Sequence, residues 1–428
     1  MKVDRTVLAA SLAAACLIQP ASARADVVLD WNAIMVSTVA GQNPLNEARI
    51  ATITQLAVFE AVNAITGKYE PYLGTVTAPA GASQEAAAIV AAHDVLVHYL
   101  PAAAASLAAA RDASLATIPD GQAKQDGMAV GAEAAAVMIA EREGDGSAPP
   151  LFYPPAPPAP GVWQATPSCS PAGGAFFHAP NVKPFGLETA DQFRLGPPPA
   201  FLTGRWTRDY IESKKLGRID SPFRPQDRAD VARFYAVVLG VQTWNPAMRQ
   251  AAAAEHKSLT YNARAFALLN MAIVDGFIAV MDTKYTHTFW RPETAIKAGH
   301  TDGNPFTLPD PAWAPFITVP CHPSYPSAHA TLAGGAREVA ERAYGNSGHS
   351  ITLQSALVPG VVLHYTRFQE IARDIDDARI YGGVHYRFDQ EDGGKLGKKV
   401  GTFLYKHVLK SSHHASELAE VAETDSRE

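Results

Sequence analysis

The sequence predicts an all-α protein, a helical bundle, and three observations lead to that prediction. Residues 46–65 repeat apolar side chains at three- and four-residue steps, which is the period of one helix face. Residues 83–143 are rich in alanine, the residue with the highest helix propensity. No series of segments alternates apolar and polar residues as a large sheet requires. With 428 residues, the chain can bury a large core.

Residues 1–25 have the pattern of a secretory signal peptide. Lys2 and Arg5 give a charged start, an apolar centre follows, and Ala23-Arg24-Ala25 is an A-x-A cleavage site. The apolar centre is too short for a comfortable membrane span. We therefore expect an exported protein, periplasmic or secreted.

The pattern from residue 26 to residue 146 is helical throughout. Pro101 separates two alanine-rich stretches, and Gly144 marks the end of the last helix. The helices expected in this part of the chain cover residues 46–65, 83–100, 102–118 and 122–143.

Residues 148–202 change character, because four clusters of prolines break any long regular element. Trp163, Phe176, Phe177 and Phe185 favour packing against the body of the protein over disorder. We expect an ordered covering loop here.

Helical patterns resume after this loop. Residues 265–281 are strongly apolar but include Asn270 and Asp275, so we expect no uninterrupted membrane span in the mature chain. A single domain over residues 26–410 is expected, followed by a disordered polar tail at 411–428. The later helices are expected at 206–216, 226–238, 246–283 (in one or two pieces), 328–344 and 394–409.

Charge and cysteine content limit the possible functions. A net charge of −6 argues against nucleic-acid binding, which usually needs a basic face. After cleavage of the signal peptide, Cys169 and Cys321 remain. In an oxidising compartment they can pair, and as separate buried thiols they would act as small apolar side chains, so the sequence leaves both arrangements open.

Chemistry-bearing residues gather in three short islands between residues 284 and 389. In the first island, Lys284 and Arg291 are seven residues apart, almost two helical turns, so one helix would present both on the same face. The alternative is an ordinary solvated helix face. Phe289 and Trp290 favour partial burial of the arginine instead.

The second island is Pro326-Ser327-Ala328-His329, directly before a stretch of good helical composition. Ser327 is a natural helix N-cap, and that structural role would be enough to explain it. The same position also binds anions, because the first amides of a helix carry partial positive charge. The Ser327 hydroxyl and the Ala328 amide could then both donate to a ligand near His329.

The third island holds Arg379, His385 and Asp389. The four-residue step from His385 to Asp389 would put both on one helix face, where a carboxylate fixes the tautomer of the imidazole. Gly382 and Gly383 offer the chain break that would turn Arg379 inward as well. A satisfied core histidine and a simple Arg379–Asp389 ion pair are the structural alternatives.

Cations, a hydroxyl and histidines suit a compact oxyanion better than a bare metal cation. The order and spacing of the three islands resemble the motifs of the vanadium-dependent haloperoxidase and type 2 phosphatidic acid phosphatase superfamily. The resemblance implies an all-α fold like that of vanadium chloroperoxidase. This sequence departs from the family pattern at Ala328, where a glycine is usual, and at Ala378, where a serine is frequent.

The resemblance also implies a role for each site residue. His385 would bind the central atom of the oxyanion with Asp389 supporting its imidazole, and His329 would be the acid–base histidine. The oxygens of vanadate or phosphate would be held by Lys284, Arg291, Ser327, Ala328 (through its amide) and Arg379.

We therefore expect a vanadate-dependent haloperoxidase that oxidises halide with hydrogen peroxide. His322 stands where bromoperoxidases of the family carry a histidine, which favours bromide or iodide. The alternatives are a secreted acid phosphatase with His385 as nucleophile, and, from another class, a non-catalytic oxyanion-binding protein. A zinc site of His322, His329 and His385 has no carboxylate or thiolate partner at ligand spacing. The oligomeric state stays open, a homo-oligomer included.

Overall fold

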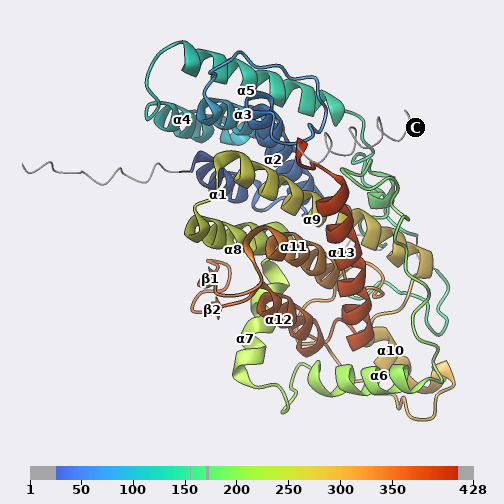
Figure 1. The fold of residues 1–428 in the computed structure, drawn as a ribbon. Coiled ribbons are helices and arrows are strands. Elements are labelled where there is room, and N and C mark those ends of the chain that lie inside the picture. The colour runs from blue at the N-terminus through green and yellow to red at the C-terminus, as the bar shows by residue number, and fades with distance from the viewer. Residues whose placement is uncertain (1–25, 155, 170–172, 413–428) are drawn as a thin grey trace, which may run out of the picture.

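The computed structural model describes residues 26–154, 156–169 and 173–412, and it confirms the predicted all-α fold (Figure 1). Within these residues, strand is limited to one antiparallel hairpin. The elements are α1 (Val27–Val39), α2 (Pro44–Thr66), α3 (Gln84–Tyr99), η1 (Pro101–Ala103), α4 (Ala104–Leu115), α5 (Gln122–Glu141), η2 (Ala179–Asn181), α6 (Gly204–Leu216), α7 (Gln226–Val237), α8 (Gly240–Glu255), α9 (Leu259–His287), α10 (Pro292–Ala298), η3 (Gly299–Asp302), α11 (Ala328–Tyr344), β1 (Ile351–Gln354), β2 (Val362–Tyr365), α12 (Phe368–Tyr381) and α13 (Arg387–His407).

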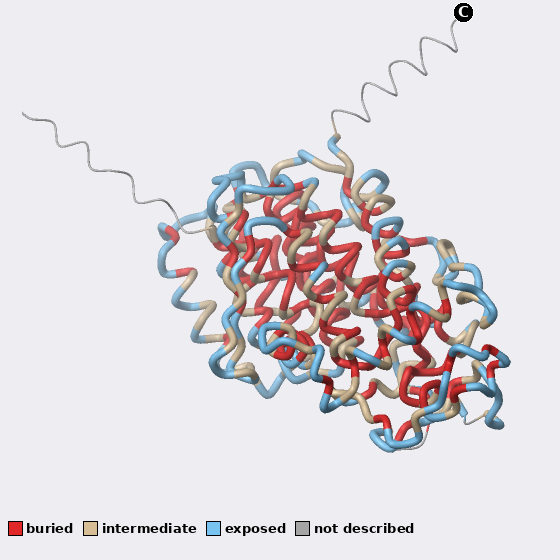
Figure 2. Tube along the Cα trace, turned by 90° about the horizontal axis from the view of Figure 1, so that it is seen from below, coloured by how far each residue is buried: buried red, intermediate tan, exposed pale blue. Residues whose placement is uncertain are grey.

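Helix α9 lies at the centre of the bundle and packs against α2, α11 and α13. Every residue from 262 to 284 is buried, and buried residues fill the middle of the molecule (Figure 2). In the described ranges it is the one helix long and apolar enough to cross a membrane, whereas the sequence predicted none. Its most apolar stretch lies wholly inside the fold, as in the core helix of a globular protein.

The polar residues of α9 are satisfied internally, which is why so long a helix can be buried. Asn270 exchanges side-chain hydrogen bonds with Asn245 at 2.9 and 3.0 Å. Asp275 accepts the backbone N–H groups of residues 185, 186 and 187 at 2.7 to 3.0 Å. Burial without such partners would be costly for both side chains.

The helix ends follow from their capping residues. Asn43 caps α2 through bonds to two backbone amides, Pro44 occupies the first helical position, and Gly67 closes the helix in the left-handed conformation (φ 61°). Ser83 caps α3 in the same way as Asn43 caps α2. The predicted helices at 46–65 and 83–100 are confirmed with small shifts at their ends.

The region predicted as helical from 246 to 283 is two helices, and its start was placed too late. Helix α8 begins at Gly240, because the Thr243 amide already donates to the Leu239 carbonyl at 2.9 Å, upstream of Pro246. His256 ends α8 in the left-handed conformation (φ 48°). Ser258 then caps α9.

The stretch from 345 to 381 had no assigned elements in the sequence. It forms the β1–β2 hairpin, with Ile351 paired to Tyr365, and then α12. Phe368, Ile371 and Ile375 bury one face of α12 at three- and four-residue steps. The last predicted helix, α13, begins at Arg387, seven residues before its predicted start at Gly394.

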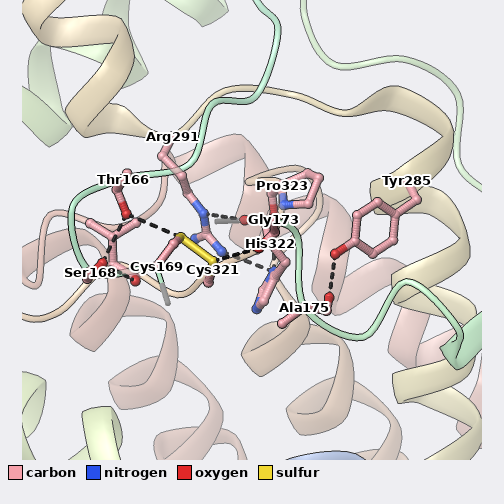
Figure 3. The surroundings of a disulfide bond; sticks show 11 residues. Thr166, Ser168, Cys169, Gly173, Ala175, Tyr285, Arg291, Cys321, His322 and Pro323 are labelled. Atoms are coloured by element: carbon pink, nitrogen blue, oxygen red, sulfur yellow. Dashed lines mark hydrogen bonds between the residues drawn. A yellow bond between two sulfur atoms is a disulfide. The ribbon is translucent and has the colours of Figure 1, made fainter. Parts of the chain in front are cut away.

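The described parts of residues 148–202 run across the C-terminal end of α9. The Trp163 amide donates to the Thr288 carbonyl at 2.7 Å, and Trp163 itself is buried. The Ala175 amide donates to the Cys321 carbonyl at 2.6 Å. Cys169 and Cys321, whose pairing the sequence left open, form a disulfide (Figure 3).

Both predicted terminal segments fall mainly outside the described residues. The signal peptide at 1–25 lies outside them, as do residues 413–428 of the predicted tail. Ser411 pairs with Tyr69 in an isolated bridge, and the Ser412 amide donates to the Lys68 carbonyl, so the tail begins in contact with the fold.

Candidate active site

The three islands meet around one aromatic cluster. The first and third islands place aromatic residues beside polar site residues, with Trp290 before Arg291 and Phe388 before Asp389, and Tyr325 directly precedes the second island. The rings of Tyr386 and Phe388 stack with centroids 5.0 Å apart. Because buried aromatic rings pack in few orientations, the cluster fixes the backbone from which the polar side chains extend. The buried members are Trp206, Tyr210, Phe289, Trp290, Trp313, Tyr325, Tyr386 and Phe388, with Ala295 and Ile296.

Lys284 and Arg291 do not share one continuous helix, so that part of the prediction was wrong. Thr288 takes the left-handed conformation (φ 46°) and ends α9, and Arg291 is the N-cap of α10. The two side chains still converge on one loop. Lys284 Nζ donates to the carbonyls of residues 323 and 324 at 2.7 and 2.8 Å, and Arg291 Nε donates to the His322 carbonyl at 2.8 Å.

Ser327 is the N-cap of α11, as predicted, and its hydroxyl accepts the Ala330 amide at 3.3 Å. Ala328 is the first helical residue, so its amide has no partner within the helix. As a helical residue, position 328 accepts alanine as well as glycine. His329 follows, half-buried, with a backbone hydrogen bond to Tyr235 and no partner for Nε2 in the described structure.

Arg379 lies in the last turn of α12, and its Nη1 donates to the Tyr235 carbonyl at 3.3 Å. The predicted break follows at Gly382 and Gly383, and Gly383 has a φ of 77°. A Cβ on Gly383 would lie 2.3 Å from the Gly217 carbonyl oxygen, so both the conformation and the close approach require glycine.

His385 lies two residues before α13, so the predicted pairing along one helix face was wrong. The contact itself exists: His385 Nδ1 and Asp389 Oδ2 are 2.7 Å apart. An ionised Asp389 accepts a hydrogen bond from the Nδ1–H group, so the lone pair of the neutral imidazole is on Nε2. Nε2 lies 3.0 Å from Arg291 Nη1, inside the ring of cations.

Sequence reasoning missed Ser324, which completes the support of His385. The Ser324 hydroxyl donates to Asp389 Oδ2 at 2.6 Å, and the Tyr386 amide donates to the same oxygen at 3.2 Å. Ser324 stands outside the family motifs quoted from the sequence, and a lone serine in a loop carries no signal. The Tyr235 carbonyl, which holds Arg379, was equally hidden because it is a backbone group.

His322 is bound by Arg291 through two of its atoms. Its carbonyl accepts from Nε, and its Nδ1 lies 3.1 Å from Nη2 (Figure 3). The guanidinium of Arg291 therefore links the loop carrying His322 to the loop carrying His385. Such a planar fork with several donors could not be replaced by the single ammonium group of a lysine.

Three buried cations define the electrostatics of the site. Lys284, Arg291 and Arg379 are at most 2% exposed, and none of them forms an ion pair with a carboxylate in the described part of the chain. Burial and the neighbouring cations lower the pKa of Lys284 well below its usual value. Burial lowers the pKa of Arg291 to about 10, and burial with Arg291 lowers that of Arg379 to about 9. Asp389 is the carboxylate whose charge acts on Lys284 and Arg291, so three cations face one nearby anion, at a cost to the fold.

The three histidines of the site are neutral in this environment. Burial first, and then the charges of the cations, lower the pKa values of His322, His329 and His385 well below the usual value. Burial raises the pKa of Asp389 to about 6, which leaves it ionised at neutral pH. Neutral imidazoles can act as ligands and accept protons.

A tetrahedral oxyanion fits this arrangement. It would supply the missing negative charge and accept hydrogen bonds from the cations, Ser327 and the Ala328 amide. The described residues contain no group of three or more His, Cys, Asp or Glu side chains that could hold a metal cation. The donor set is therefore suited to vanadate or phosphate, held by its oxygens.

Comparisons with known proteins agree with this site. A family model described as the VCPO second helical-bundle domain matches residues 264–414, the stretch that contains every predicted site residue. This C-terminal region is therefore similar to that helical-bundle domain. No curated protein matches the sequence.

Solved structures show the same fold over almost the whole chain. A bacterial vanadium-dependent iodoperoxidase is 22% identical with a TM-score of 0.74, and the match covers 90% of this chain and 96% of that one. A holo-type bacterial vanadium-dependent chloroperoxidase is 17% identical with a TM-score of 0.70, covering 86% and 93%. An apo-type bacterial chloroperoxidase has a TM-score of 0.66 at 17% identity, covering 84% and 93%. The similarity in fold thus extends beyond the matched C-terminal region.

Proposed function

We propose that this protein is a vanadate-dependent haloperoxidase that oxidises halide with hydrogen peroxide. The observation that carries the proposal is the cage of three buried cations, none of them paired with a carboxylate, around Nε2 of His385. Solved structures of the same fold include vanadium-dependent iodoperoxidase and chloroperoxidase, which favours halide oxidation over other reactions of the superfamily. Halide, peroxide and one proton give hypohalous acid and water.

Each site residue has a distinct task in this proposal. Lys284, Arg291 and Arg379 hold the oxyanion and compensate its charge, together with the Ser327 hydroxyl and the Ala328 amide. His385 would ligate the central atom of a bound vanadate through Nε2, with its imidazole oriented by Asp389. Vanadate, when bound there, supplies the activation of peroxide.

His329 is the group that moves protons. Its Nε2 has no hydrogen-bond partner in the described structure, and its lowered pKa makes it neutral at neutral pH. A neutral imidazole can take a proton from peroxide as it binds and return one when water forms. We further propose bromide or iodide as the halide, because the position of His322 matches that of the histidine in bromoperoxidases.

Export is part of the same proposal. Residues 1–25 have the features of a signal peptide, and the Cys169–Cys321 disulfide is of the kind that persists in oxidising compartments. Fractionation of cells that express the chain tests this: the protein should lie outside the cytoplasm and lack residues 1–25. Full-length protein in the cytoplasm would contradict export.

The main test separates haloperoxidase from phosphatase. The purified protein is freed of vanadate, divided, and one half is reloaded with vanadate. Bromide oxidation by peroxide should appear only in the reloaded half. If the protein is instead a phosphatase with His385 as nucleophile, a phosphate ester is hydrolysed by the vanadate-free half, and vanadate inhibits that hydrolysis.

Two variants tie the result to the site. His385→Ala should lose oxyanion-dependent turnover by at least about 100-fold, because the ligand atom and its Asp389 support act together. His300→Ala is the matched control, since His300 is exposed on η3. Equal activity in the two variants would refute the roles proposed for the cage.

Arg379→Met tests the charge argument directly. Removing one buried cation should raise the melting temperature of the oxyanion-free protein, because the repulsion within the cage falls. The same variant should lose the stabilisation by vanadate. For one site, this stabilisation is about 2.7 kcal/mol when the free vanadate concentration is about 100 times Kd. A variant that is destabilised yet still stabilised by vanadate would show that Arg379 serves the fold alone.

A further inference from the structure

Exposed apolar side chains gather around α6. Of the eleven large apolar residues that are exposed in the described ranges, six lie on α6, in the loops on either side of it, or in the loop after η3. Single exposed apolar residues are normal on a protein surface, whereas a cluster of them marks an interaction site. These six residues, which we call the α6 patch, are Leu202, Ile211, Ile219, Phe223, Phe306 and Leu308.

The loop after η3 has polar side chains inside and apolar side chains outside. Asn304 and Thr307 are buried. Phe306, in contrast, is 70% exposed and Leu308 is 63% exposed. The Thr307 hydroxyl and the Asn304 backbone amide both donate to Asp302 Oδ1 at 2.8 Å. Because these buried hydrogen bonds fix the loop, the fold itself holds the two apolar side chains in water.

The loop after α6 has the same arrangement. Ser221 is buried, and its hydroxyl donates to the Lys215 carbonyl at 2.7 Å. Arg224 is half-buried, and its guanidinium donates to two backbone carbonyls of the same loop at 2.8 Å. Ile219 and Phe223 are nevertheless more than half exposed. A second loop, fixed by internal hydrogen bonds, thus presents apolar side chains to water.

The C-terminal half of α6 connects the two loops and supplies positive charge. Lys214 Nζ donates to the Leu308 carbonyl at 2.6 Å, and Lys215 Nζ lies 4.0 Å from the centre of the Phe223 ring. Residues 201–225 contain six Lys or Arg and three Asp or Glu, in a chain whose net charge is −6. The α6 patch is therefore bordered by basic side chains.

This combination fits a membrane surface better than a second copy of the chain. In a twofold dimer the same patch of both subunits meets, so the two basic borders would repel each other. A bilayer with anionic lipids avoids this repulsion, because the lysines contact lipid phosphates. Apolar side chains at the tips of loops enter the boundary between headgroups and acyl chains.

We propose that the α6 patch docks this protein on the surface of a membrane that contains anionic lipids. Phe223, Phe306 and Leu308 enter the headgroup layer. Lys214 and Lys215 remain at its surface, with their charged ends on the lipid phosphates.

Docking at this surface places the candidate site at the membrane end of the molecule. Helix α6 lies along one end of the protein, and α3, α4 and α5 lie at the opposite end (Figure 1). On the buried side of α6, the Ser213 hydroxyl donates to the His385 carbonyl at 2.9 Å. The helix that borders the membrane is thus in direct contact with the loop that carries His385.

Sedimentation with lipid vesicles tests the proposal. The protein without residues 1–25 is mixed with vesicles of phosphatidylcholine alone or of phosphatidylcholine with phosphatidylglycerol. Residues 1–25 are omitted because their apolar centre would bind lipid by itself. Binding is expected with phosphatidylglycerol, and added salt should weaken it. No binding, or equal binding to both kinds of vesicle, overturns the inference.

The apolar contribution is tested by Phe306→Ser combined with Leu308→Ser. Vesicle binding should weaken by at least about tenfold, because the variant has no apolar side chains at the tip of this loop. The melting temperature should stay the same, since both side chains are exposed. Leu357→Ser with Val362→Ser, in the β1–β2 hairpin, is the matched control and should bind unchanged. Equal binding by the two double variants refutes the role of the α6 patch.

The charge contribution is tested by Lys214→Gln combined with Lys215→Gln. Binding to the anionic vesicles should weaken by about tenfold or more. Glutamine keeps a donor for the Leu308 carbonyl, so the loop after η3 stays in place. Lys398→Gln with Lys399→Gln removes the same charge from an exposed part of α13 and should change binding little. Equal losses in both variants would mean attraction by net charge alone and would overturn the proposal.

Sedimentation velocity without lipid tests the alternative of a second copy. The oligomeric state of the Phe306→Ser, Leu308→Ser variant should equal that of the original protein. A dimer that becomes monomeric in this variant would assign the α6 patch to a subunit interface and overturn membrane docking. None of these measurements involves halide oxidation, so their results and those for the proposed function are independent.

Discussion

Helices α3 and α5 in the N-terminal half and helices α11 and α13 in the C-terminal half form two closely packed pairs (Figure 1). Both rely on glycines of one helix facing the backbone of the other. On α5, a Cβ at Gly127 would lie 2.3 Å from the Ser83 carbonyl oxygen, and one at Gly131 would lie 2.4 Å from that of Ala87. Only glycine permits so short a distance between helices.

Helices α11 and α13 also pack through glycines, and the candidate site lies at their N-terminal ends. On α13, a Cβ at Gly393 would lie 2.6 Å from the Ser327 carbonyl oxygen, and one at Gly397 would lie 1.9 Å from that of Thr331. Helix α11 starts directly after Ser327, and α13 starts two residues after His385. The Ser327 amide donates to the Asp389 carbonyl at 2.9 Å, which joins the two helix starts.

The difference between the pairs lies in what close packing achieves. Between α3 and α5 it buries alanine surface and stabilises a scaffold. Between α11 and α13 it also brings the start of α11, where we propose that the oxyanion binds, close to the His385 imidazole that precedes α13. We therefore expect equivalent substitutions to affect stability alike and oxyanion affinity very differently. The following predictions are ordered by their expected effect on that affinity.

Gly397→Ala should have the largest effect. The added methyl group meets the Thr331 carbonyl, so α13 must move away from α11, at a cost of about 1–3 kcal/mol or more in the free energy of unfolding. Oxyanion affinity should fall by more than about 100-fold, since an ångström of displacement at a preorganised site costs about that much. Denaturant unfolding and vanadate titration measure the two effects. Unchanged vanadate affinity in this variant would contradict the comparison.

Asp389→Asn leaves the packing of the helices intact and removes the support of His385. Loss of such a supporting carboxylate costs about 10–100-fold in metal affinity or activity. Vanadate binding and bromide oxidation should both fall by this amount. Ser412→Ala, near the surface beyond α13, is a control for substitution in the C-terminal region. An Asn variant with full affinity would mean that Ser324 and Arg291 orient the imidazole sufficiently.

Oxyanion affinity should also fall as the pH rises. Lys284 has a lowered pKa in the oxyanion-free cage, and a bound anion raises it, so binding takes up a proton once the pH exceeds the lowered value. For an oxyanion of constant charge such as tungstate, affinity should then fall by up to about tenfold per pH unit. Titrations in buffers of different ionisation enthalpy measure the proton uptake. Lys284→Met should flatten the dependence, and an equally steep slope in that variant would assign the proton elsewhere.

Gly131→Ala should have the smallest effect on affinity. Its methyl group meets the Ala87 carbonyl, so a loss of about 1–3 kcal/mol of stability is expected. Vanadate affinity of the folded protein should stay within about twofold, since α3 and α5 hold no site residue. A large loss of affinity here would show that the two halves of the bundle are coupled, contrary to the comparison.

Patterns within short stretches allowed much of the fold to be predicted. Ser83 and Ser327 predict helix starts, because each capping hydroxyl binds the backbone amide three residues later in the sequence. The hairpin at 351–365 was missed because its strands have only four residues each. The end of α9 was missed because Thr288, a residue of no special turn preference, takes the left-handed conformation.

At the site, residue identities were easier to predict than geometry. Lys284, Arg291, His385 and Asp389 were singled out by spacing, but the helical faces assumed for them do not exist, and tertiary contacts bring them together instead. The pairing of Cys169 with Cys321 spans 152 residues, a separation over which spacing carries no information.

If the protein generates hypohalous acid as proposed, the Cys169–Cys321 disulfide also protects the site from oxidation. Thiols are consumed first by such oxidants, and Cys321 stands immediately before His322. Because the two sulfurs are bonded to each other, Cys321 presents no free thiol to an oxidant formed beside it. The protein would then resist oxidation over many turnovers because of this disulfide, without help from a repair system.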